Sequence, residues 1–325
     1  MAGEKPDVLL MGQKKPVMVE GLSPKVNLHY LTDAHDPDAF IKEIGGKIGA
    51  IAIAMTHNKL DAAFMQKFPK LELISSFGVG YDHVDAKWAG AHGIIVTNTP
   101  DVLNEEVADT ALGLLLCTAR EFPQAERYLR AGKWPGGHYP LSRATLRGRT
   151  VGIVGLGRIG KAIARRLEAF GVDVVYHSRN PQAGVKYKYY PKLLDMARDV
   201  DTLMVIVPGG SATQNMIDAE VLKALGPNGI IINMARGSVV DEPALIEALK
   251  NKTIYAAGLD VFAKEPHVPQ ELIEMDNVVL LPHLGSASVA TRTAMDQLVV
   301  DNIVAWAAGK PPLTPVPETP YPPKK

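Results

Sequence analysis

The stretch from Thr150 to Asn180 constrains this chain most, because it has the pattern of a strand, a turn, a helix and a second strand. Thr150 to Val154 is an apolar, β-branched run that leads directly into Gly155-Leu156-Gly157-Arg158-Ile159-Gly160. The helical pattern Lys161 to Phe170 follows, and Val172 to Tyr176 gives the next strand. A glycine triplet between a strand and a helix is the context that a dinucleotide fingerprint requires. The sequence therefore predicts a dinucleotide-binding site here.

Each glycine of the triplet has its own physical role. Gly155 permits the tight turn, Gly157 lets the backbone approach a pyrophosphate, and Gly160 lets the helix pack close to the strand. The N-terminus of the following helix offers unpaired N–H groups to the phosphates. A purely structural turn between strand and helix is the alternative for the glycines taken alone.

The residues after the second strand indicate which coenzyme is bound. An NAD enzyme normally places an Asp or Glu there for the ribose hydroxyls, and this chain has His177-Ser178-Arg179-Asn180 instead. Ser178 can hydrogen-bond a 2′-phosphate and Arg179 can pair with it bidentately, whereas a carboxylate would repel it. The sequence favours NADP(H), and an ordinary solvated arginine is the alternative.

Length and charge limit the class of protein. At 325 residues the chain exceeds what one core usually supports, so two domains are expected. Its 35 basic and 35 acidic residues give no global field for nucleic acid or an anionic membrane. Cys117, the single cysteine, lies in an apolar helical pattern, which predicts core filling and excludes an internal disulfide. The apolar run Val8 to Met11 is too short for a signal peptide, so a soluble, cytoplasmic protein is predicted.

Strands and helices alternate along the whole chain. Four strands are predicted before the fingerprint, at Val8–Met11, Gly49–Met55, Leu71–Ser76 and Ile94–Val96. Six are predicted from the fingerprint onward, at Thr150–Val154, Val172–Tyr176, Thr202–Val207, Ile230–Asn233, Tyr255–Leu259 and Val278–Leu281. Helical patterns separate them, and a long one reaches about Ala119. This alternation predicts an α/β protein with two Rossmann-like, doubly wound parallel-sheet domains.

Two further segments stand out. Val79 and Gly80 lie in a glycine-rich turn after a buried strand, which predicts a small anionic ligand there, with a plain tight turn as the alternative. Residues 132 to 147 are rich in proline, glycine and aromatic residues, including Trp134. Such a long irregular segment is usually functional or lies at an interface.

Three polar residues follow strands that end at the same edge of the predicted sheet: Arg236, Glu265 and His283. Open α/β sheets bind ligands at that edge. Hydride transfer to a ketone needs a cation for the carbonyl and carboxylate, which Arg236 supplies. It also needs an acid for the new alkoxide. His283 can donate that proton near neutral pH, with Glu265 orienting the ring and favouring its protonated form. Alone, each has a bland alternative: a surface arginine, a solvated glutamate, a histidine after a proline.

Several motifs together resemble the D-2-hydroxyacid dehydrogenases. They are Val154 to Gly160, Asn233 to Gly237, Gly258 to Pro266 and Leu281 to Gly285. Within that family, the chain is most similar to the NADPH-dependent glyoxylate/hydroxypyruvate reductases. The segments that carry this similarity are Ser178-Arg179, Lys186 to Tyr190 and Glu265 to Pro269.

The resemblance implies a role for each matching residue. Arg236 would hold the 2-oxo acid, Glu265 and His283 would deliver the proton, and the amides of Val79 and Gly80 would bind the substrate carboxylate. The implied coenzyme residues are Gly155, Leu156, Gly157, Arg158, Ile159 and Gly160 at the pyrophosphate, Ser178, Arg179 and Asn180 at the 2′-phosphate, and Met234, Ala235, Arg236 and Asp260 toward the nicotinamide. No metal site is predicted.

The resemblance also implies an organisation. The substrate domain would comprise residues 1–102 and 290–325, and the NADP-binding domain residues 103–289. A homodimer is expected, with the segment from Trp134 to Leu141 reaching toward the partner. No nucleic-acid or membrane partner is expected.

Three alternatives stay open at this point. Formate dehydrogenases have glutamine where Glu265 stands, and long phosphoglycerate dehydrogenases need a regulatory extension, so both resemble the chain less. A non-enzymatic, nucleotide-sensing corepressor of the same fold is a different class. Among 2-oxo acids, an aromatic one such as hydroxyphenylpyruvate competes with glyoxylate and hydroxypyruvate. Met55, Thr56, Phe77 and Tyr81 are candidates to line the pocket, in an orientation that the sequence leaves open.

Overall fold

The computed structural model describes residues 4–55 and 58–322 and divides the chain into two compact units. Unit 1 comprises residues 1–103 and 288–325, and unit 2 comprises residues 104–287. The bounds predicted from the sequence differ from these by one or two residues. Thr56 falls outside the described residues. Among the described residues, no helix is both long and apolar enough to cross a membrane.

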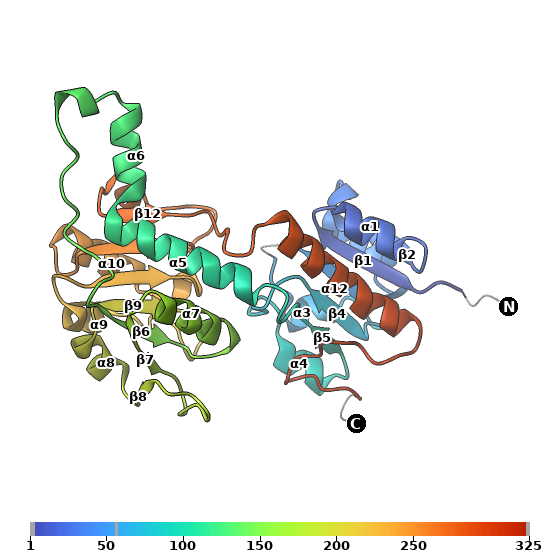
Figure 1. Cartoon of the computed structure of the whole chain (residues 1–325). Coiled ribbons are helices and arrows are strands. Elements are labelled where there is room, and N and C mark those ends of the chain that lie inside the picture. The colour runs from blue at the N-terminus through green and yellow to red at the C-terminus, as the bar shows by residue number, and fades with distance from the viewer. Residues whose placement is uncertain (1–3, 56–57, 323–325) are drawn as a thin grey trace. The chain divides into compact units, whose positions relative to one another are not determined.

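Unit 1 is built on five parallel strands (Figure 1). They are β1 (Asp7–Gly12), β2 (Asn27–Tyr30), β3 (Ile48–Ala54), β4 (Leu73–Ser76) and β5 (Ile95–Thr97), in the spatial order β2-β1-β3-β4-β5. Its helices are α1 (Pro16–Leu22), α2 (Pro37–Ile44), α3 (Ala62–Met65), α4 (Ala86–Ala91) and α12 (Val289–Ala307). The strand order reverses between β1 and β3, and such a switch point opens a crevice at the carboxyl ends of these two strands.

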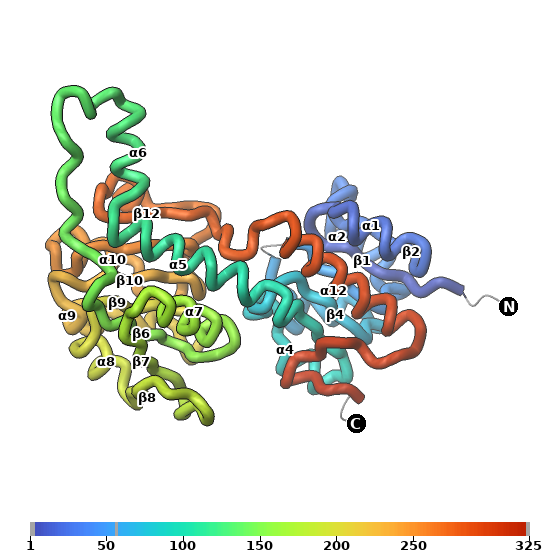
Figure 2. Tube along the Cα trace, in the orientation of Figure 1, coloured from blue at the N-terminus to red at the C-terminus, as the bar shows by residue number. Residues whose placement is uncertain are grey.

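Helices cover both faces of this sheet, which explains why its central strands are mostly apolar. Strand β3, Ile-Gly-Ala-Ile-Ala-Ile-Ala, is buried along almost its whole length. On one face, α2, α3 and α4 contribute to a core with β1, β3 and β4. Against the other face lie α1 and α12, which run side by side (Figures 1 and 2). The segment after Lys310 folds back on β5, where Val316 N–H donates to Val96 O at 2.9 Å.

Unit 2 contains a seven-stranded parallel sheet. Its strands are β6 (Thr150–Val154), β7 (Asp173–His177), β8 (Lys188–Tyr190), β9 (Thr202–Val205), β10 (Ile230–Asn233), β11 (Ala256–Leu259) and β12 (Val278–Leu280), in the order β12-β11-β10-β9-β6-β7-β8. Its helices are α5 (Asn104–Arg120), α6 (Phe122–Arg130), α7 (Arg158–Ala169), α8 (Leu193–Asp199), α9 (Ala219–Leu225), α10 (Glu242–Lys250) and α11 (Gln270–Glu274). The order reverses between β6 and β9, where a doubly wound sheet binds its ligand.

The helices of unit 2 also lie on both faces of the sheet. One face carries α5 and α7, which are neighbours in both views (Figures 1 and 2). The other face carries α8, α9 and α10, whose apolar side chains form one core with β9, β10 and β11. Two parallel, helix-covered sheets confirm the predicted fold class.

Two sequence-based predictions about unit 2 need correction, the number of strands and the start of α7. The sheet has seven strands where six were predicted, because the short edge strand β8 pairs with β7. Helix α7 begins at Arg158, earlier than the apolar periodicity indicated, because its first turn is the glycine motif itself. Residue Glu121, with φ of 57°, separates α6 from α5. Within the irregular segment, Trp134–Gly136 form a single 3-10 turn.

Candidate active site

The glycine motif forms the link between β6 and α7, at the switch point of unit 2. Gly155 has φ of 103°, and a Cβ there would lie 2.8 Å from Val207 Cγ1. At Gly160 a Cβ would lie 2.2 Å from Gly155 O, so the close packing of helix on strand excludes any side chain. At Gly157, the N-cap of α7, a Cβ would meet nothing within 4 Å. Open space at an uncapped helix N-terminus fits a pyrophosphate.

The loop after β7 has the composition that the sequence predicted for a 2′-phosphate. Arg179 and Asn180 are exposed, and no carboxylate stands in the His177-Ser178-Arg179-Asn180 turn. The hydroxyl of Ser178 donates to Asn180 O at 2.6 Å, and the hydroxyl of Tyr189 donates to Ser178 O at 3.2 Å. The turn is thus held by its own hydrogen bonds and by β8, and Arg179 is an exposed residue of it.

His283 and Glu265 form a direct pair in unit 2. The imidazole Nδ1 of His283 lies 2.7 Å from Glu265 Oε2, and Glu265 Oε1 accepts the N–H of Phe262 at 3.0 Å. The His283 side chain is 47% exposed, against 24% for Glu265. Both carboxylate oxygens of Glu265 are therefore held by hydrogen bonds, while one edge of the His283 ring stays open to a ligand.

Asp260 holds the backbone on which His283 sits. Its two carboxylate oxygens accept the N–H groups of Leu284 at 2.7 Å and Gly285 at 2.9 Å, and its carbonyl accepts His283 N–H at 2.9 Å. His283 has φ of 51°, a left-handed conformation that is uncommon for a non-glycine residue. Such backbone strain persists only where the surroundings enforce it, and Asp260 supplies those contacts.

Arg236 follows β10 and begins a short 3-10 turn, Gly237–Val239. Its Nη1 donates to Ala235 O at 2.8 Å. The amide of Asn233 donates to Arg236 O at 3.1 Å and accepts Ala235 N–H at 3.1 Å, which fixes the loop. Gly237 packs so closely on the backbone of Phe262 that a Cβ would lie 1.9 Å from it. The Arg236 loop is thereby joined to the segment that leads to Glu265.

The electrostatics of this cluster favour an ionised Glu265. Burial raises the pKa of Glu265, but the hydrogen bond and the charge of His283, the Phe262 N–H and the Arg236 guanidinium outweigh it, so the pKa lies below its usual value. Burial also raises the pKa of Asp260, and there it prevails over the opposing N–H groups of Leu284 and Gly285. Within residues 4–55 and 58–322, no three His, Cys, Asp or Glu side chains form a group that could hold a metal ion.

The predicted carboxylate-binding turn lies in unit 1, after β4. Gly78 N–H donates to Thr99 Oγ1 at 3.0 Å, and the Asn98 amide donates to Val79 O at 2.8 Å. The N–H groups of Val79 and Gly80 have no hydrogen-bond acceptor among the residues that the structure describes. Successive unpaired amides in a glycine turn suit a small anion.

The residues proposed to line the pocket have different environments within unit 1. Phe77 is buried, Met55 is 50% exposed and the hydroxyl of Tyr81 donates to Glu318 at 3.0 Å. Thr56 lies outside the described residues. The structure therefore brings Arg236, Glu265 and His283 together in unit 2, and it describes Val79 and Gly80 in unit 1 by themselves.

Sequence reasoning missed three residues that position this site. They are Asn233 under the Arg236 loop, Glu242, which accepts Ala263 N–H at 3.0 Å, and Thr110, whose hydroxyl donates to Gly285 O at 3.1 Å. Asn233 is 1% exposed. A buried polar side chain at the carboxyl end of an otherwise apolar strand is a local signal for such a role, whereas Glu242 and Thr110 act across long sequence separations.

Comparison with known proteins decides the family. The model of the D-isomer specific 2-hydroxyacid dehydrogenase NAD-binding domain matches residues 112–285. This chain belongs to the D-isomer specific 2-hydroxyacid dehydrogenase family. The match confirms the resemblance inferred from the motifs and, with it, the prediction of a 2-hydroxyacid dehydrogenase. It lies entirely within unit 2.

Individual relatives extend over nearly the whole chain. Glyoxylate/hydroxypyruvate reductase A of Arabidopsis thaliana is 43% identical over 309 residues, which are 95% of this chain and 98% of that protein. Hydroxyphenylpyruvate reductase of Plectranthus scutellarioides is 47% identical over 256 residues, 79% of this chain and 82% of the relative. The crystal structure of an NADPH-dependent glyoxylate/hydroxypyruvate reductase from Sinorhizobium meliloti, with NADP and malonate, has a TM-score of 0.93 and 52% identity, and covers 98% of each chain.

Proposed function

We propose that this family member reduces a small 2-oxo acid, glyoxylate or hydroxypyruvate, to the D-2-hydroxy acid with NADPH. The observation that carries the proposal is the paired Glu265 and His283 beside Arg236, on loops that leave the carboxyl edge of the unit 2 sheet. A fixed cation, a proton donor and a carboxylate that orients the donor are what carbonyl reduction requires.

Each residue of the cluster has a distinct part in the reaction. Bound NADPH supplies the hydride, which goes to the carbonyl carbon of the substrate. The guanidinium of Arg236 binds the carboxylate and the carbonyl oxygen, where negative charge develops. His283 gives the proton on Nε2 to that oxygen, so that a hydroxyl forms. Glu265 holds Nδ1 and stabilises the protonated ring from which the proton leaves.

The coenzyme preference rests on the loop after β7. A 2′-phosphate beside Ser178, Arg179 and Asn180 meets a guanidinium and no competing carboxylate. The pyrophosphate would lie over the segment Gly155 to Gly160, where Gly157 leaves open space. Met234, Ala235 and Asp260 would flank the nicotinamide end. The related Sinorhizobium structure, solved with NADP, supports the same preference.

The substrate carboxylate would bind the amides of Val79 and Gly80 in unit 1. The relatives support a small 2-oxo acid as the substrate, since both the Arabidopsis and the Sinorhizobium proteins are glyoxylate/hydroxypyruvate reductases. The 47% identity with a hydroxyphenylpyruvate reductase makes an aromatic 2-oxo acid the second candidate.

A side-by-side kinetic comparison tests the proposal. Purified protein with NADPH is given glyoxylate, hydroxypyruvate and hydroxyphenylpyruvate, and kcat/KM is measured for each. We expect the two small acids to have the higher values. A higher value for the aromatic acid would support the second candidate. Absence of turnover on all three, with NADPH binding intact by calorimetry, would favour the nucleotide-sensing binding protein.

A further inference from the structure

Three residues of unit 1 lie at the carboxyl ends of adjacent strands. Lys15 follows β1, Met55 follows β3 and Phe77 follows β4, and these three strands are neighbours in the sheet. The strand order reverses between β1 and β3, so this edge is where a doubly wound sheet binds ligands. Phe77 also immediately precedes the turn with Val79 and Gly80.

The ammonium group of Lys15 is buried at this edge and has two partners. It lies 2.7 Å from Asp296 Oδ1 of α12 and 3.3 Å from the centroid of the Phe77 ring. The side chains of Lys15 and Asp296 are 11% and 9% exposed, and Phe77 is 8% exposed. Arg292 adds a second cation, 5.3 Å from the same ring, and its Nη1 lies 3.6 Å from Met55 Sδ.

Stability alone is a weak reason for a buried lysine. Removing a charge pair from water carries a large desolvation penalty, and apolar residues of similar volume are often equally stabilising. Burial lowers the pKa of Lys15, while the hydrogen bond and charge of Asp296 oppose that change. The pair does, however, restrain the orientation of the Phe77 ring. A cation prefers the face of an aromatic ring, whereas an apolar contact has no such directional preference.

Fixing Phe77 restrains the start of the substrate turn. Phe77 N–H donates to Ile53 O at 3.2 Å, which ties its backbone to β3. The next residue, Gly78, has φ of 123°, a conformation that gives the chain little restraint of its own. Thr99 and Asn98 hold the turn from its far side. On the near side, the Phe77 ring contacts Lys15 and, at the longer distance of 5.3 Å, Arg292.

We propose that Lys15 is a positioning residue for the substrate: held by Asp296, it fixes the Phe77 ring and thereby the amides of Val79 and Gly80 that bind the 2-oxo acid carboxylate. The inference rests on the proposed function for its substrate and on unit 1 geometry for the positioning itself. Loss of Lys15 should therefore raise KM for the acid while kcat and the affinity for NADPH stay nearly unchanged.

The test compares the full-length wild type with the double variant Lys15→Met, Asp296→Leu. The double change avoids leaving Asp296 buried without a partner, which in Lys15→Met alone would endanger folding. Hydrogen–deuterium exchange of the peptide spanning residues 73–84 reports on the turn without any turnover. We expect faster exchange there, and a KM for glyoxylate about 3- to 30-fold higher, the range of one cation–π contact. Lys15→Arg, which keeps a cation over the ring, should retain most of the wild-type protection of residues 73–84 from exchange.

A neighbouring lysine provides the matched control. Lys14 makes the same two kinds of contact, with Asp33 Oδ2 at 2.5 Å and with the Tyr30 ring at 4.4 Å, but its side chain is 41% exposed. Lys14→Met, Asp33→Leu should leave both exchange and KM unchanged. Unaltered exchange at residues 73–84 in the Lys15 double variant would overturn the proposal. Wild type without turnover would sink the proposed function instead, and exchange would still decide the role of Lys15.

Discussion

The imidazole of His283 has two nitrogens in different environments. Nδ1 is bound to Glu265 at 2.7 Å, and Nε2 has no hydrogen bond to any described residue. Because the pKa of Glu265 is lowered, its carboxylate is ionised at neutral pH and accepts a hydrogen bond from the N–H at Nδ1. In the proposed reaction, the proton that leaves is then the one on Nε2. A single carboxylate would thus select which ring nitrogen takes part in the chemistry.

Glu265→Gln should separate the charge of this residue from its shape. Glu265 has a lowered pKa, so it stays negative throughout the neutral and alkaline range, and protonated His283 benefits from that charge. The amide lacks the charge. In reduction, which needs the proton, the alkaline limb of kcat/KM against pH should therefore move to lower pH.

The exposed carboxylate Glu274 on α11 gives the control for this experiment. Glu274→Gln removes one negative charge from the same unit without touching His283, and its rate profile should match the wild type. An alkaline limb that stays in place in Glu265→Gln would mean that Glu265 only holds the ring.

Arg179→Ala should weaken the binding of NADPH and leave the binding of NADH almost unchanged. Only NADPH carries the 2′-phosphate, and a charge-assisted hydrogen bond contributes about 1.5–3 kcal/mol. KM for NADPH should rise about 10- to 100-fold, with KM for NADH within about twofold. Initial rates at saturating 2-oxo acid measure both constants. Equal losses for the two coenzymes would refute the assignment of Arg179 to the phosphate.

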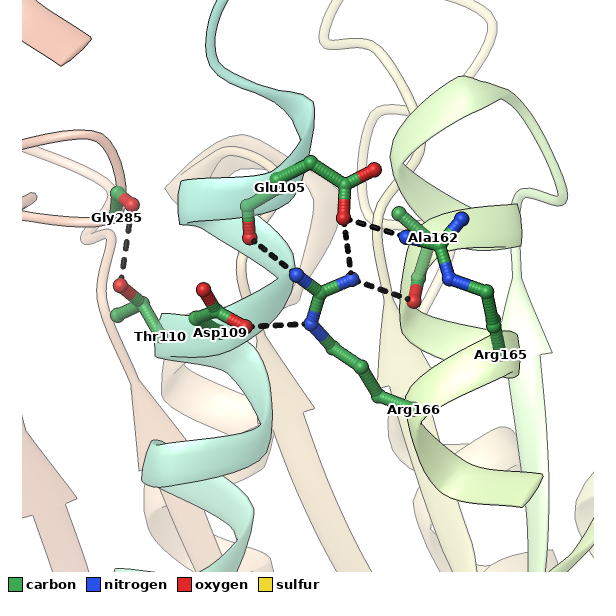
Figure 3. A network of polar contacts seen from close by, with 7 residues as sticks. All are labelled: Glu105, Asp109, Thr110, Ala162, Arg165, Arg166 and Gly285. Atoms are coloured by element: carbon green, nitrogen blue, oxygen red, sulfur yellow. Dashed lines mark hydrogen bonds and ion pairs between the residues drawn. The ribbon is translucent and has the colours of Figure 1, made fainter. Parts of the chain in front are cut away.

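Helix α5 connects two parts of the site that are far apart in sequence. Figure 3 shows its first turns meeting α7, where Arg166 donates from Nε to Asp109 at 2.5 Å and lies 2.8 Å from the carboxylate of Glu105. On its other side, Thr110 of α5 donates to Gly285 O, just beyond His283. Helix α7 and the loop that carries His283 are thus attached to one helix.

Arg166→Met should loosen α7 from α5. The Arg166 side chain is 17% exposed and also donates to the carbonyls of Ala162 and Glu105, so methionine keeps the packing and loses several hydrogen bonds. We expect Tm to fall by about 2–4 °C in differential scanning fluorimetry. Arg165→Met is the control, because Arg165 binds the same Glu105 but is 64% exposed, and its Tm should change by less than about 1 °C. Equal changes would contradict a special role for Arg166.

The elements that the sequence predicted well are those buried on both faces. Strands such as β3 and β10 are continuous apolar runs, because helices cover the sheet on each side. The edge strands β5 and β12 were predicted as well, but the other two edge strands lack that signal. Asn27-Leu28-His29-Tyr30 of β2 and Lys188-Tyr189-Tyr190 of β8 are short and partly exposed, and they read as loops until their neighbours are known. Each of these two segments becomes a strand because it pairs with a neighbouring strand.

The site shows a similar division. Arg236, Glu265 and His283 could be predicted because each follows a strand and parallel strands end at one edge. The supports of the site lie elsewhere in the sequence. Lys15 and Asp296 are 281 residues apart, and Thr110 reaches Gly285 from another helix, so no local pattern joins them. Such contacts depend on how helices pack, which periodicity does not specify.

At the scale of the whole molecule, the surface of α6 predicts self-association. This helix buries none of its residues, and Phe122 and Leu129 are 47% and 54% exposed. In the segment that follows, Trp134 is 61% and Leu141 95% exposed. Large apolar side chains gathered on neighbouring segments mark a protein-binding surface. We expect a homodimer, as the sequence predicted.

Analytical ultracentrifugation measures this directly. The wild type should sediment at about 70 kDa, twice the 35.0 kDa of the chain, and Leu129→Asp should shift the protein toward 35.0 kDa. Phe170→Asp changes a phenylalanine of similar exposure, 49%, at the C-cap of α7, and this variant should remain dimeric. A monomeric wild type would exclude the dimer, and a dimeric Leu129→Asp would move the interface away from α6.

The discontinuity of unit 1 has a consequence for synthesis on the ribosome. All five of its strands precede residue 98, whereas α12, which covers one face of their sheet beside α1, begins at Val289. The nascent sheet must therefore wait while residues 104–287 are made, about 10–40 s at bacterial to eukaryotic elongation rates. The synthesis of unit 2 is therefore complete before that of unit 1. During that interval Asp296 has not yet been made, so Lys15 lacks its partner. A helix made after unit 2 thus completes a unit begun before it, so translation order leaves the sheet of unit 1 exposed to aggregation and chaperones for that interval.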